Sequence, residues 1–233
     1  MKNNIFKNNL KFTKDSKVLF VYPHPDDETF CNAGLIQRLV KMGVNPYVIC
    51  LTKGEASTLQ YGVSADESLS NVRAEEFTSV MKLLKVENFS IYDFTDGGIE
   101  NEIDAVSKIL ETIIANISPD FIFTYEPCGV YGHPDHITLS SLVSELSIKH
   151  SIKLIYSTVD ARYKPSKQLL SMAKDPESIK PLFPNFVIKL TILELLKKLK
   201  CFSLYKSQFN AKSNLIDSIR FISLIKNECY FIV

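Results

Sequence analysis

The chain has 233 residues, of which 45% are hydrophobic and 23% charged, with 10 Pro and 8 Gly, and this composition excludes disordered, collagen-like and coiled-coil proteins. Its 27 basic residues nearly balance 26 acidic ones, so the net charge of +1 provides no overall field for nucleic acid or anionic lipid. A chain of this length can bury one large hydrophobic core. We therefore expect a single domain over residues 1–233 and no nucleic-acid partner, with the oligomeric state, homo-oligomers included, left open.

The cysteines and the N-terminus indicate the compartment. The five cysteines are widely spaced and form no CxxC pair, which argues against a disulfide framework or a thiolate zinc site. No apolar run is long enough for a transmembrane helix, and the Lys- and Asn-rich N-terminus lacks the apolar core of a signal peptide. We expect a cytoplasmic protein without an integral membrane segment. Residues 1–15 are expected to form a partly ordered arm that Ile5, Phe6, Leu10 and Phe12 attach to the surface.

Apolar runs and helical periodicities alternate regularly from residue 17 to residue 159. The apolar runs predict strands over residues 17–22, 46–52, 89–94, 120–125 and 153–159. Apolar residues at helical spacing predict helices over residues 30–43, 68–85, 102–117 and 136–149. This alternation is typical of right-handed βαβ units. We therefore predict an α/β fold with a Rossmann-like core over residues 16–160, in which helices cover both faces of a mostly parallel sheet.

The pattern loosens after residue 160 into loops that contain proline. One amphipathic helix is predicted over residues 187–200. We expect residues 161–233 to form a C-terminal extension packed on the core. The helix carries Lys197, Lys198 and Lys200, which we interpret as a solvated face in preference to a membrane contact or a partner helix.

Two polar motifs follow the first and the fourth predicted strand. Residues 23–28 are PHPDDE, and residues 131–136 are YGHPDH. Because an open parallel sheet binds its ligands at the carboxyl ends of its strands, we expect both motifs at one edge of the sheet. Three of the four histidines of the chain, His24, His133 and His136, lie in these two segments.

The spacing within the motifs suits a metal ion. His24 lies three residues before Asp27, and His133 three residues before His136, which puts both side chains of each pair on one side of a turn. Two imidazoles, one carboxylate and a water form the ligand set of a catalytic zinc site. The spacing does not decide between Asp26 and Asp27 as the carboxylate ligand. The alternative is that both motifs are Asp-rich turns that only cap helices.

The motifs resemble the two signatures of the LmbE-like de-N-acetylases, the PIG-L family, which includes N-acetylglucosaminyl-phosphatidylinositol de-N-acetylases and the deacetylases of mycothiol and bacillithiol synthesis. The resemblance runs from the first strand to about residue 160. It also includes Gly34, residues 52–55 and 73–76, Asp96 with Gly97, and a weaker similarity at residues 205–208. The resemblance implies that His24, Asp27 and His136 are the zinc ligands and that Asp26 is the general base.

The remaining site residues follow from the same resemblance. It implies that His133 is the general acid or stabilises the oxyanion, held by Asp135, whose carboxylate would favour the protonated imidazole. It assigns Arg73 to a sugar substituent, the alternative being an exposed Arg73 paired with Glu76. Either Asp96 binds sugar hydroxyls or it only makes a turn.

Two further residues near the motifs have two interpretations each, and two others depart from the family pattern. The side chain of Tyr131 either donates to the carbonyl oxygen of the substrate or packs. Glu28 either orients a ligand or caps a helix. Pro23 stands where the family usually has a small residue, and Tyr205 where it usually has a histidine, so the resemblance does not specify the substrate.

We predict a zinc-dependent hydrolase that removes the acetyl group from an N-acetylglucosamine-type amino sugar or its conjugate. One alternative is a zinc amidase or esterase acting on another acyl bond. Another is a non-catalytic sugar- or nucleotide-binding module with a Rossmann-like fold. The segment from Pro23 to Phe30 contains no glycine, which argues against dinucleotide binding. The sequence does not decide whether His133 or Asp26 protonates the leaving amine.

Overall fold

The structure is a computed structural model that describes residues 10–160, 163–209 and 215–233. The predicted contacts of Ile5 and Phe6 lie outside the described residues. Leu10 and Phe12 are buried in the core, so the last part of the predicted N-terminal arm is attached to the domain. None of the helices in the described ranges is both long enough and apolar enough to cross a membrane.

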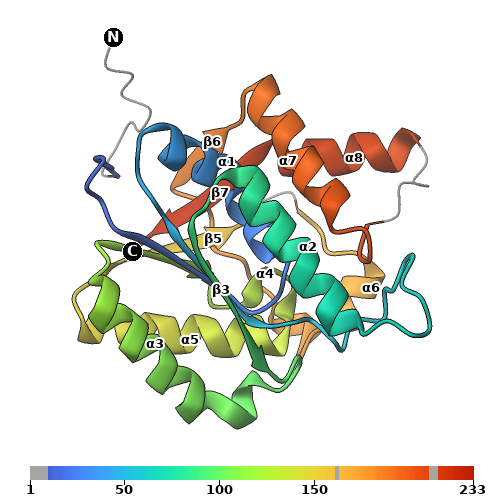
Figure 1. The fold of residues 1–233 in the computed structure, drawn as a ribbon, viewed down its shortest axis with the longest axis horizontal. Helices are drawn as coiled ribbons and strands as arrows, with labels where there is room; N and C mark the ends of the chain where they lie inside the picture. Colours follow the sequence, from blue (N-terminus) through green and yellow to red (C-terminus); the bar gives the residue numbers. More distant parts are fainter. Residues whose placement is uncertain (1–9, 161–162, 210–214) are drawn as a thin grey trace.

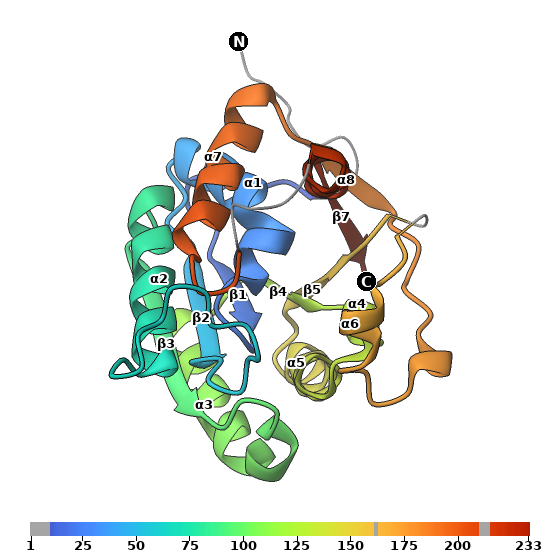
Figure 2. The ribbon, with the colours of Figure 1, turned by 90° about the vertical axis from the view of Figure 1, so that its right-hand side faces the viewer.

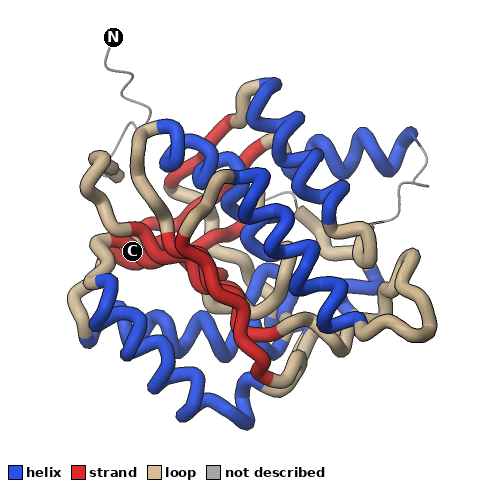
Figure 3. The backbone as a smooth tube through the Cα atoms, in the orientation of Figure 1, coloured by secondary structure: helices blue, strands red, loops and turns tan. Residues whose placement is uncertain are grey.

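One twisted sheet runs through the molecule (Figure 3). Its strands are β1 (Val18–Tyr22), β2 (Tyr47–Thr52), β3 (Asn88–Phe94), β4 (Phe121–Tyr125), β5 (Lys153–Thr158), β6 (Phe186–Lys189) and β7 (Asn227–Ile232). They lie in the order β3-β2-β1-β4-β5-β7-β6. The first five strands are parallel, whereas β7 pairs antiparallel with both β5 and β6. All of β1 is buried, as expected of a central strand.

Helices cover both faces of the sheet. The longer ones are α1 (Asp27–Lys41), α2 (Leu69–Leu84), α3 (Ile103–Ile117), α5 (Pro134–Lys149), α7 (Ile192–Leu204) and α8 (Leu215–Ile225). The short ones are α4 (Gly129–Gly132), α6 (Lys167–Leu170) and the 3₁₀ turns at Ile99–Glu102 and Pro176–Ser178. In Figure 1, α3 and α5 lie below the sheet, and α1, α2 and α7 lie above it.

Each face of the sheet has its own hydrophobic core. Side chains of β1 alternate between them: Phe20 packs with residues of α1 and α2, whereas Leu19 and Val21 pack with residues of α3 and α5. This alternation follows from the two-residue period of a strand, because successive side chains point to opposite faces. The observed layers confirm the predicted α/β class and the predicted parallel order of the first five strands.

The predicted helix over residues 187–200 is wrong at its start. Residues Phe186–Lys189 form the strand β6, and α7 begins only at Ile192. The side chain of Thr191 accepts a hydrogen bond from the backbone N–H of Glu194 at 3.3 Å, and the Glu194 carboxylate accepts one from the backbone N–H of Thr191 at 2.8 Å. This reciprocal pair is a capping box, which fixes the first residue of the helix.

The predicted solvated lysine face of α7 is wrong for Lys198. Its side chain is fully buried, and its ammonium donates to Oε1 of Glu228 at 2.7 Å and to the carbonyl of Phe30 at 2.7 Å. The Glu228 carboxylate also accepts from the backbone N–H groups of Gly34 and Leu35, at 2.7 and 2.8 Å. A buried ion pair therefore connects α7 and β7 to the middle of α1.

Candidate metal centre

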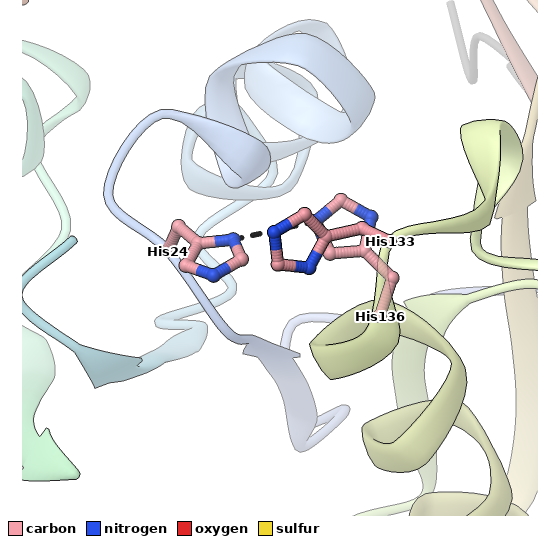
Figure 4. A group of neighbouring side chains, drawn as sticks. All are labelled: His24, His133 and His136. Carbon is pink, nitrogen blue, oxygen red and sulfur yellow. Dashed lines mark hydrogen bonds between the residues drawn. The ribbon is translucent and has the colours of Figure 1, made fainter. Parts of the chain in front are cut away.

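Both polar motifs lie at the carboxyl edge of the sheet. The strands β1 and β4, which precede them, are neighbours. His24 extends from the loop after β1, whereas His133 and His136 lie at the start of α5, and Figure 4 shows the three rings close together. The turn that follows His24 needs an unusual backbone, since Asp26 has a φ of 106°. The fold thus brings His24 together with two histidines that lie more than 100 residues later in the sequence.

The ligand atoms of three predicted residues face one another. Nδ1 of His24 lies 3.3 Å from Nε2 of His136 and 3.4 Å from Oδ2 of Asp27. Oδ1 of the same carboxylate lies 3.6 Å from Nε2 of His136. Ligand atoms of a tetrahedral zinc site with bonds of about 2.0–2.1 Å are roughly 3.4 Å apart. These separations therefore fit a divalent cation.

In His24 and His136, the ring nitrogen that points away from the other predicted ligands has a hydrogen-bond acceptor. Nε2 of His24 donates to Oδ1 of Asp96 at 2.9 Å, with Oδ2 of Asp135 at 3.3 Å. Nδ1 of His136 lies 3.2 Å from the carbonyl oxygen of Gly129. Because these acceptors favour ring protons on the outer nitrogens, the inner nitrogens are the ones that can bind a metal ion. Carboxylate or carbonyl acceptors behind ligating histidines are usual in metal sites.

The protonation states agree with this donor set. Burial raises the pKa of Asp27, but the neighbouring His136 and His24 outweigh burial and hold that pKa well below its usual range. Burial lowers the pKa of His136 to about 3. Burial also lowers the pKa of His24, but hydrogen bonds to Asp135, Asp27 and Asp96 raise it well above its usual value. A cation would therefore meet an ionised carboxylate and a neutral imidazole, and would displace one proton from His24.

Two other sets of ligand atoms include His24. The nitrogens of His24, His133 and His136 form one group, and the atoms of His24, Asp96 and Asp135 form another, each within 4.8 Å. His133 therefore lies beside the predicted ligands, as a residue acting on a metal-bound substrate must. The described residues at this edge could hold a metal ion.

Tyr125, the last residue of β4, is a site residue that the sequence did not reveal. Its hydroxyl donates to Oδ1 of Asp27 at 2.7 Å, and its ring stacks on the ring of His136 with centroids 4.1 Å apart. The only signal in the sequence was its position at the carboxyl end of the fourth strand. Tyr125 thus fixes the orientation of two predicted ligands.

The loop at Asp26 is held from both sides. Oε2 of Glu28 accepts from the backbone N–H of Asp26 at 3.1 Å, and Oε1 of Glu28 accepts from the hydroxyl of Tyr205 at 2.7 Å. Nη2 of Arg73 lies 3.4 Å from Oδ2 of Asp26. Burial raises the pKa of Asp26 to about 8, against the opposing charge of Arg73. The Asp26 carboxylate lines the cavity beside the metal residues.

Arg73 is buried, so the alternative of an exposed Arg73 paired with Glu76 is wrong. Its guanidinium donates to the carbonyl of Gly54 at 2.7 Å and to the carbonyl of Pro25 at 2.6 Å, while its buried Nε has no hydrogen-bond partner. The Glu76 carboxylate instead accepts from the backbone N–H and hydroxyl of Ser207. Arg73 therefore joins the loops after β1 and β2 at the wall of the cavity.

The expectation that the carboxylate of Asp135 holds the ring of His133 is wrong, although the backbone of Asp135 contacts that ring. The Asp135 carboxylate accepts from the backbone N–H groups of Gly97 and Ile99, at 2.7 and 3.2 Å, and contacts His24. Nδ1 of His133 accepts from the backbone N–H of Asp135 at 3.2 Å. Burial and the charge of His24 lower the pKa of His133 to about 4. The structure thus favours the neutral imidazole, contrary to the expectation.

The last two predicted residues line the same cavity. Tyr131 packs its ring beside His136 and His133, with centroids 5.0 and 6.0 Å apart. Asp96 uses one carboxylate oxygen for His24 and the other for the backbone N–H of Ala56, at 2.9 Å. The cavity has a volume of about 1020 Å³. All nine predicted site residues therefore lie at one edge of the sheet, and Asp96 and Asp135 both contact His24.

Comparison with known families decides the class of this site. The family described as "PIG-L: GlcNAc-PI de-N-acetylase" matches residues 19–147. The chain belongs to this family. Relatives of this PIG-L protein include a probable N-acetyl-alpha-D-glucosaminyl L-malate deacetylase 2 of Bacillus anthracis, 26% identical over 84% of this chain and 82% of the relative. A 1D-myo-inositol 2-acetamido-2-deoxy-alpha-D-glucopyranoside deacetylase of Rhodococcus opacus is 28% identical over 56% of this chain and 52% of its own, so the match spans about half of that relative.

Solved structures share the fold of this PIG-L protein. The N,N'-diacetylchitobiose deacetylase from Pyrococcus horikoshii superposes with a TM-score of 0.68 and 24% identity, over 94% of this chain and 85% of that one. The A40926 pseudoaglycone deacetylase Dbv21 superposes with a TM-score of 0.69 and 18% identity, over 93% and 97%. The predicted family, the α/β fold and the enzyme class, a de-N-acetylase, are confirmed.

Proposed function

We propose that this protein is a zinc-dependent de-N-acetylase that removes the acetyl group from an N-acetylglucosamine unit in a small conjugate. The observation that carries the proposal is the donor set in which His24, His136 and Asp27 face one another at 3.3 to 3.6 Å. The names of the relatives support the substrate class, since they are deacetylases of glucosamine conjugated to malate or to myo-inositol.

The proposed zinc ligands are His24, Asp27 and His136. A zinc ion at this position would polarise the acetamide carbonyl and lower the pKa of a bound water. Asp96 and Asp135 fix the ring of His24 through its outer nitrogen. Two imidazoles and one carboxylate leave a fourth position for water or substrate, as in other catalytic zinc sites.

Asp26 is the proposed general base. Its carboxylate lies next to the ligand Asp27 in the chain, lines the cavity and is positioned by Arg73. From there it can take a proton from the attacking water. The resemblance to the family agrees with this role, and Glu28 supports it by holding the backbone of Asp26.

His133 and Tyr131 are the proposed donors to the substrate. Both line the cavity, and the ring of His133 packs against that of His24 with centroids 4.7 Å apart. A donor here would stabilise the negative charge that develops on the carbonyl oxygen. The leaving amine also needs a proton, which the newly protonated Asp26 can supply, since the structure favours a neutral His133. Asp96 and Arg73, which both line the cavity, are the proposed contacts for the sugar.

The proposal is tested by free amine release. Metal-free protein is reloaded with one equivalent of zinc and incubated with a panel of N-acetylglucosamine conjugates, and primary amine and acetate are both quantified. We expect equal amounts of both products from at least one conjugate, and none from the metal-free protein. Release of acetate only from O-acetyl sugars would instead identify an esterase and contradict the proposal.

We also propose the predicted cytoplasmic location. All five cysteines are free thiols, which supports a reducing compartment. The proposed partner is a small amino-sugar substrate.

A further inference from the structure

The cavity is larger than one amino sugar needs. Its volume of about 1020 Å³ lies at the upper end of the roughly 300–1,000 Å³ that pockets for drug-sized ligands occupy. Its lining extends from Asp96, after β3, to Cys229, in β7. The cavity therefore continues well beyond the residues proposed to act on the acetyl group.

Strand order gives the direction of this extension. The proposed metal ligands follow β1 and β4, whereas β5 and β7 are the next two strands along the sheet. Neighbouring strands are about 4.8 Å apart, so β7 lies roughly 14 Å from β1. Figure 2 shows α6 and α8 on this side of the molecule, opposite α2 and β3. The part of the cavity beside β5, β7, α6 and α8 is called the distal chamber below.

The chemistry of the lining changes along this path. The lining near β1 includes the ionisable side chains of Asp26, Arg73 and Asp96. Apolar side chains form much of the wall of the distal chamber, among them Val159, Tyr163, Leu169, Met172, Phe209 and Leu224, and its polar residues include Asp160, Arg220 and Lys226. Such a surface favours an apolar group, because each buried methylene gains free energy on leaving water.

At least five of the polar residues that line the distal chamber have partners within the protein: Thr158, Asp160, Ser171, Arg220 and Glu228. The hydroxyl of Thr158 donates to the carbonyl of Leu182 at 2.9 Å, and the Glu228 carboxylate is paired with Lys198. The apolar wall is also held in place. The ring of Phe209 packs against that of Phe202 with centroids 4.9 Å apart, so this part of the wall is formed before a ligand binds.

We propose that the distal chamber binds an apolar alkyl or aryl aglycone of the amino sugar. This inference rests on the proposed function, since it assumes that the acetamide lies at His24, Asp27 and His136. We assign the chamber to the aglycone because the relatives are named for the same acetyl group and differ in the group that the sugar carries. The acetyl group itself is too small to reach from β1 to β7.

The test compares methyl, butyl and octyl glycosides of N-acetylglucosamine in both anomeric forms. All are used below the critical micelle concentration of the octyl glycoside, so that a lipid-like surface is absent. Up to about fourfold in kcat/KM is expected for each methylene that becomes buried, so octyl should exceed methyl by at least about tenfold. Equal values for the three glycosides would overturn this inference alone. No amine release from any glycoside would overturn the proposed function as well.

Two nearly isosteric variants test whether the preference for the octyl glycoside arises in the distal chamber. Met172→Gln and Val159→Thr place a polar group in the distal chamber, so each should lower the octyl-to-methyl ratio of kcat/KM by about threefold to tenfold. Ile148→Thr is the matched control, because Ile148 is 80% exposed on α5 and does not line the cavity. It should leave both values unchanged. An unchanged ratio in Met172→Gln and Val159→Thr, or a preference for N-octanoylglucosamine over the octyl glycoside, would overturn the assignment to the aglycone.

Discussion

The hydroxyl of Tyr125 donates a hydrogen bond of 2.7 Å to Oδ1 of Asp27. The same side chain stacks on His136, so one residue positions two of the three proposed zinc ligands. Partners of this kind behind metal ligands determine how well the ligands are oriented before the metal binds.

Replacing Tyr125 by Phe tests that relationship. Tyr125→Phe keeps the ring stacking and removes only the hydroxyl, so zinc affinity should fall by about 10- to 100-fold without loss of the fold. Competition with a fluorescent zinc chelator measures the change. Tyr156→Phe is the matched control, because its hydroxyl lies on the neighbouring strand and bonds to Ser144. Equal affinities in the two variants would mean that the Tyr125 hydroxyl does not position Asp27.

The two adjacent aspartates should separate metal binding from proton transfer. Asp27→Asn should lower bound zinc well below one per chain, because a three-ligand site depends on each donor. Asp26→Asn should retain zinc and lose on the order of 10² to 10⁴ in kcat. Elemental analysis and amine release measure the two effects. Loss of zinc only in Asp26→Asn would reverse the two roles.

The contacts of Asp135 predict that its carboxylate positions His24 and not His133. Its carboxylate contacts His24, whereas His133 is bonded only to its backbone N–H. Asp135→Asn should therefore lower zinc affinity about 10- to 100-fold, as expected of a partner to a ligand. His133→Ala should bind zinc normally and lose roughly 10² to 10³ in kcat, as when an oxyanion donor is removed. The opposite pattern would identify His133 as a ligand.

The ion pair between Arg38 and Glu194 predicts a pH-dependent contribution to stability. Burial raises the pKa of Glu194, but the bonds from Arg38 and Thr191 outweigh burial, so the folded pKa is lower than usual. A lowered folded pKa stabilises the protein above the unfolded pKa of about 4.3, and this gain is lost as the pH falls through the folded pKa.

Glu194→Gln tests this contribution and keeps an acceptor for the backbone N–H of Thr191. It should lower the free energy of unfolding by less than about 1 kcal/mol at pH 7. The difference should diminish in urea titrations as the pH falls below the unfolded pKa and through the lower folded pKa. Glu145→Gln, at an exposed position of α5, serves as the control. A difference that persists at low pH would show that the lost charge is not its cause.

The sequence predicted the elements whose signals are local. The apolar run of β1 and the helical spacing in α3 appear directly in the residues, because burial on two faces or on one stripe determines them. The strand β7 was missed because Glu228 interrupts its apolar pattern, and its partner Lys198 lies 30 residues earlier. Such a pairing appears only in the folded chain.

The same distinction applies to the site. The residue types and spacing of the two motifs predicted a metal site, and the resemblance to the family selected His24, Asp27 and His136 as its ligands. Tyr125 can bond to Asp27 because the end of β4 lies beside the start of α1. No local sequence pattern shows that two such distant segments meet. The partner of Asp135 was predicted incorrectly because nearness in sequence favoured His133, whereas the loop after β3 brings its backbone N–H groups and His24 to the carboxylate.

The buried pair of Lys198 and Glu228 gives the last prediction. Neither side chain is exposed, so Lys198→Met would leave the Glu228 carboxylate buried without a counter-charge. We expect a loss of about 3–5 kcal/mol in the free energy of unfolding, measured by urea titration. Lys200→Met, at an exposed position of the same helix, should change it by less than about 0.5 kcal/mol.

Adding Glu228→Gln to Lys198→Met separates charge from packing. The amide oxygen of Gln can accept from one of the N–H groups of Gly34 and Leu35, which bond to different oxygens of the Glu228 carboxylate, and no charge is then left buried. The double variant should therefore be more stable than Lys198→Met alone. A double variant as unstable as the single one would show that the packing of the Lys198 side chain, and not its charge, connects α7 to α1.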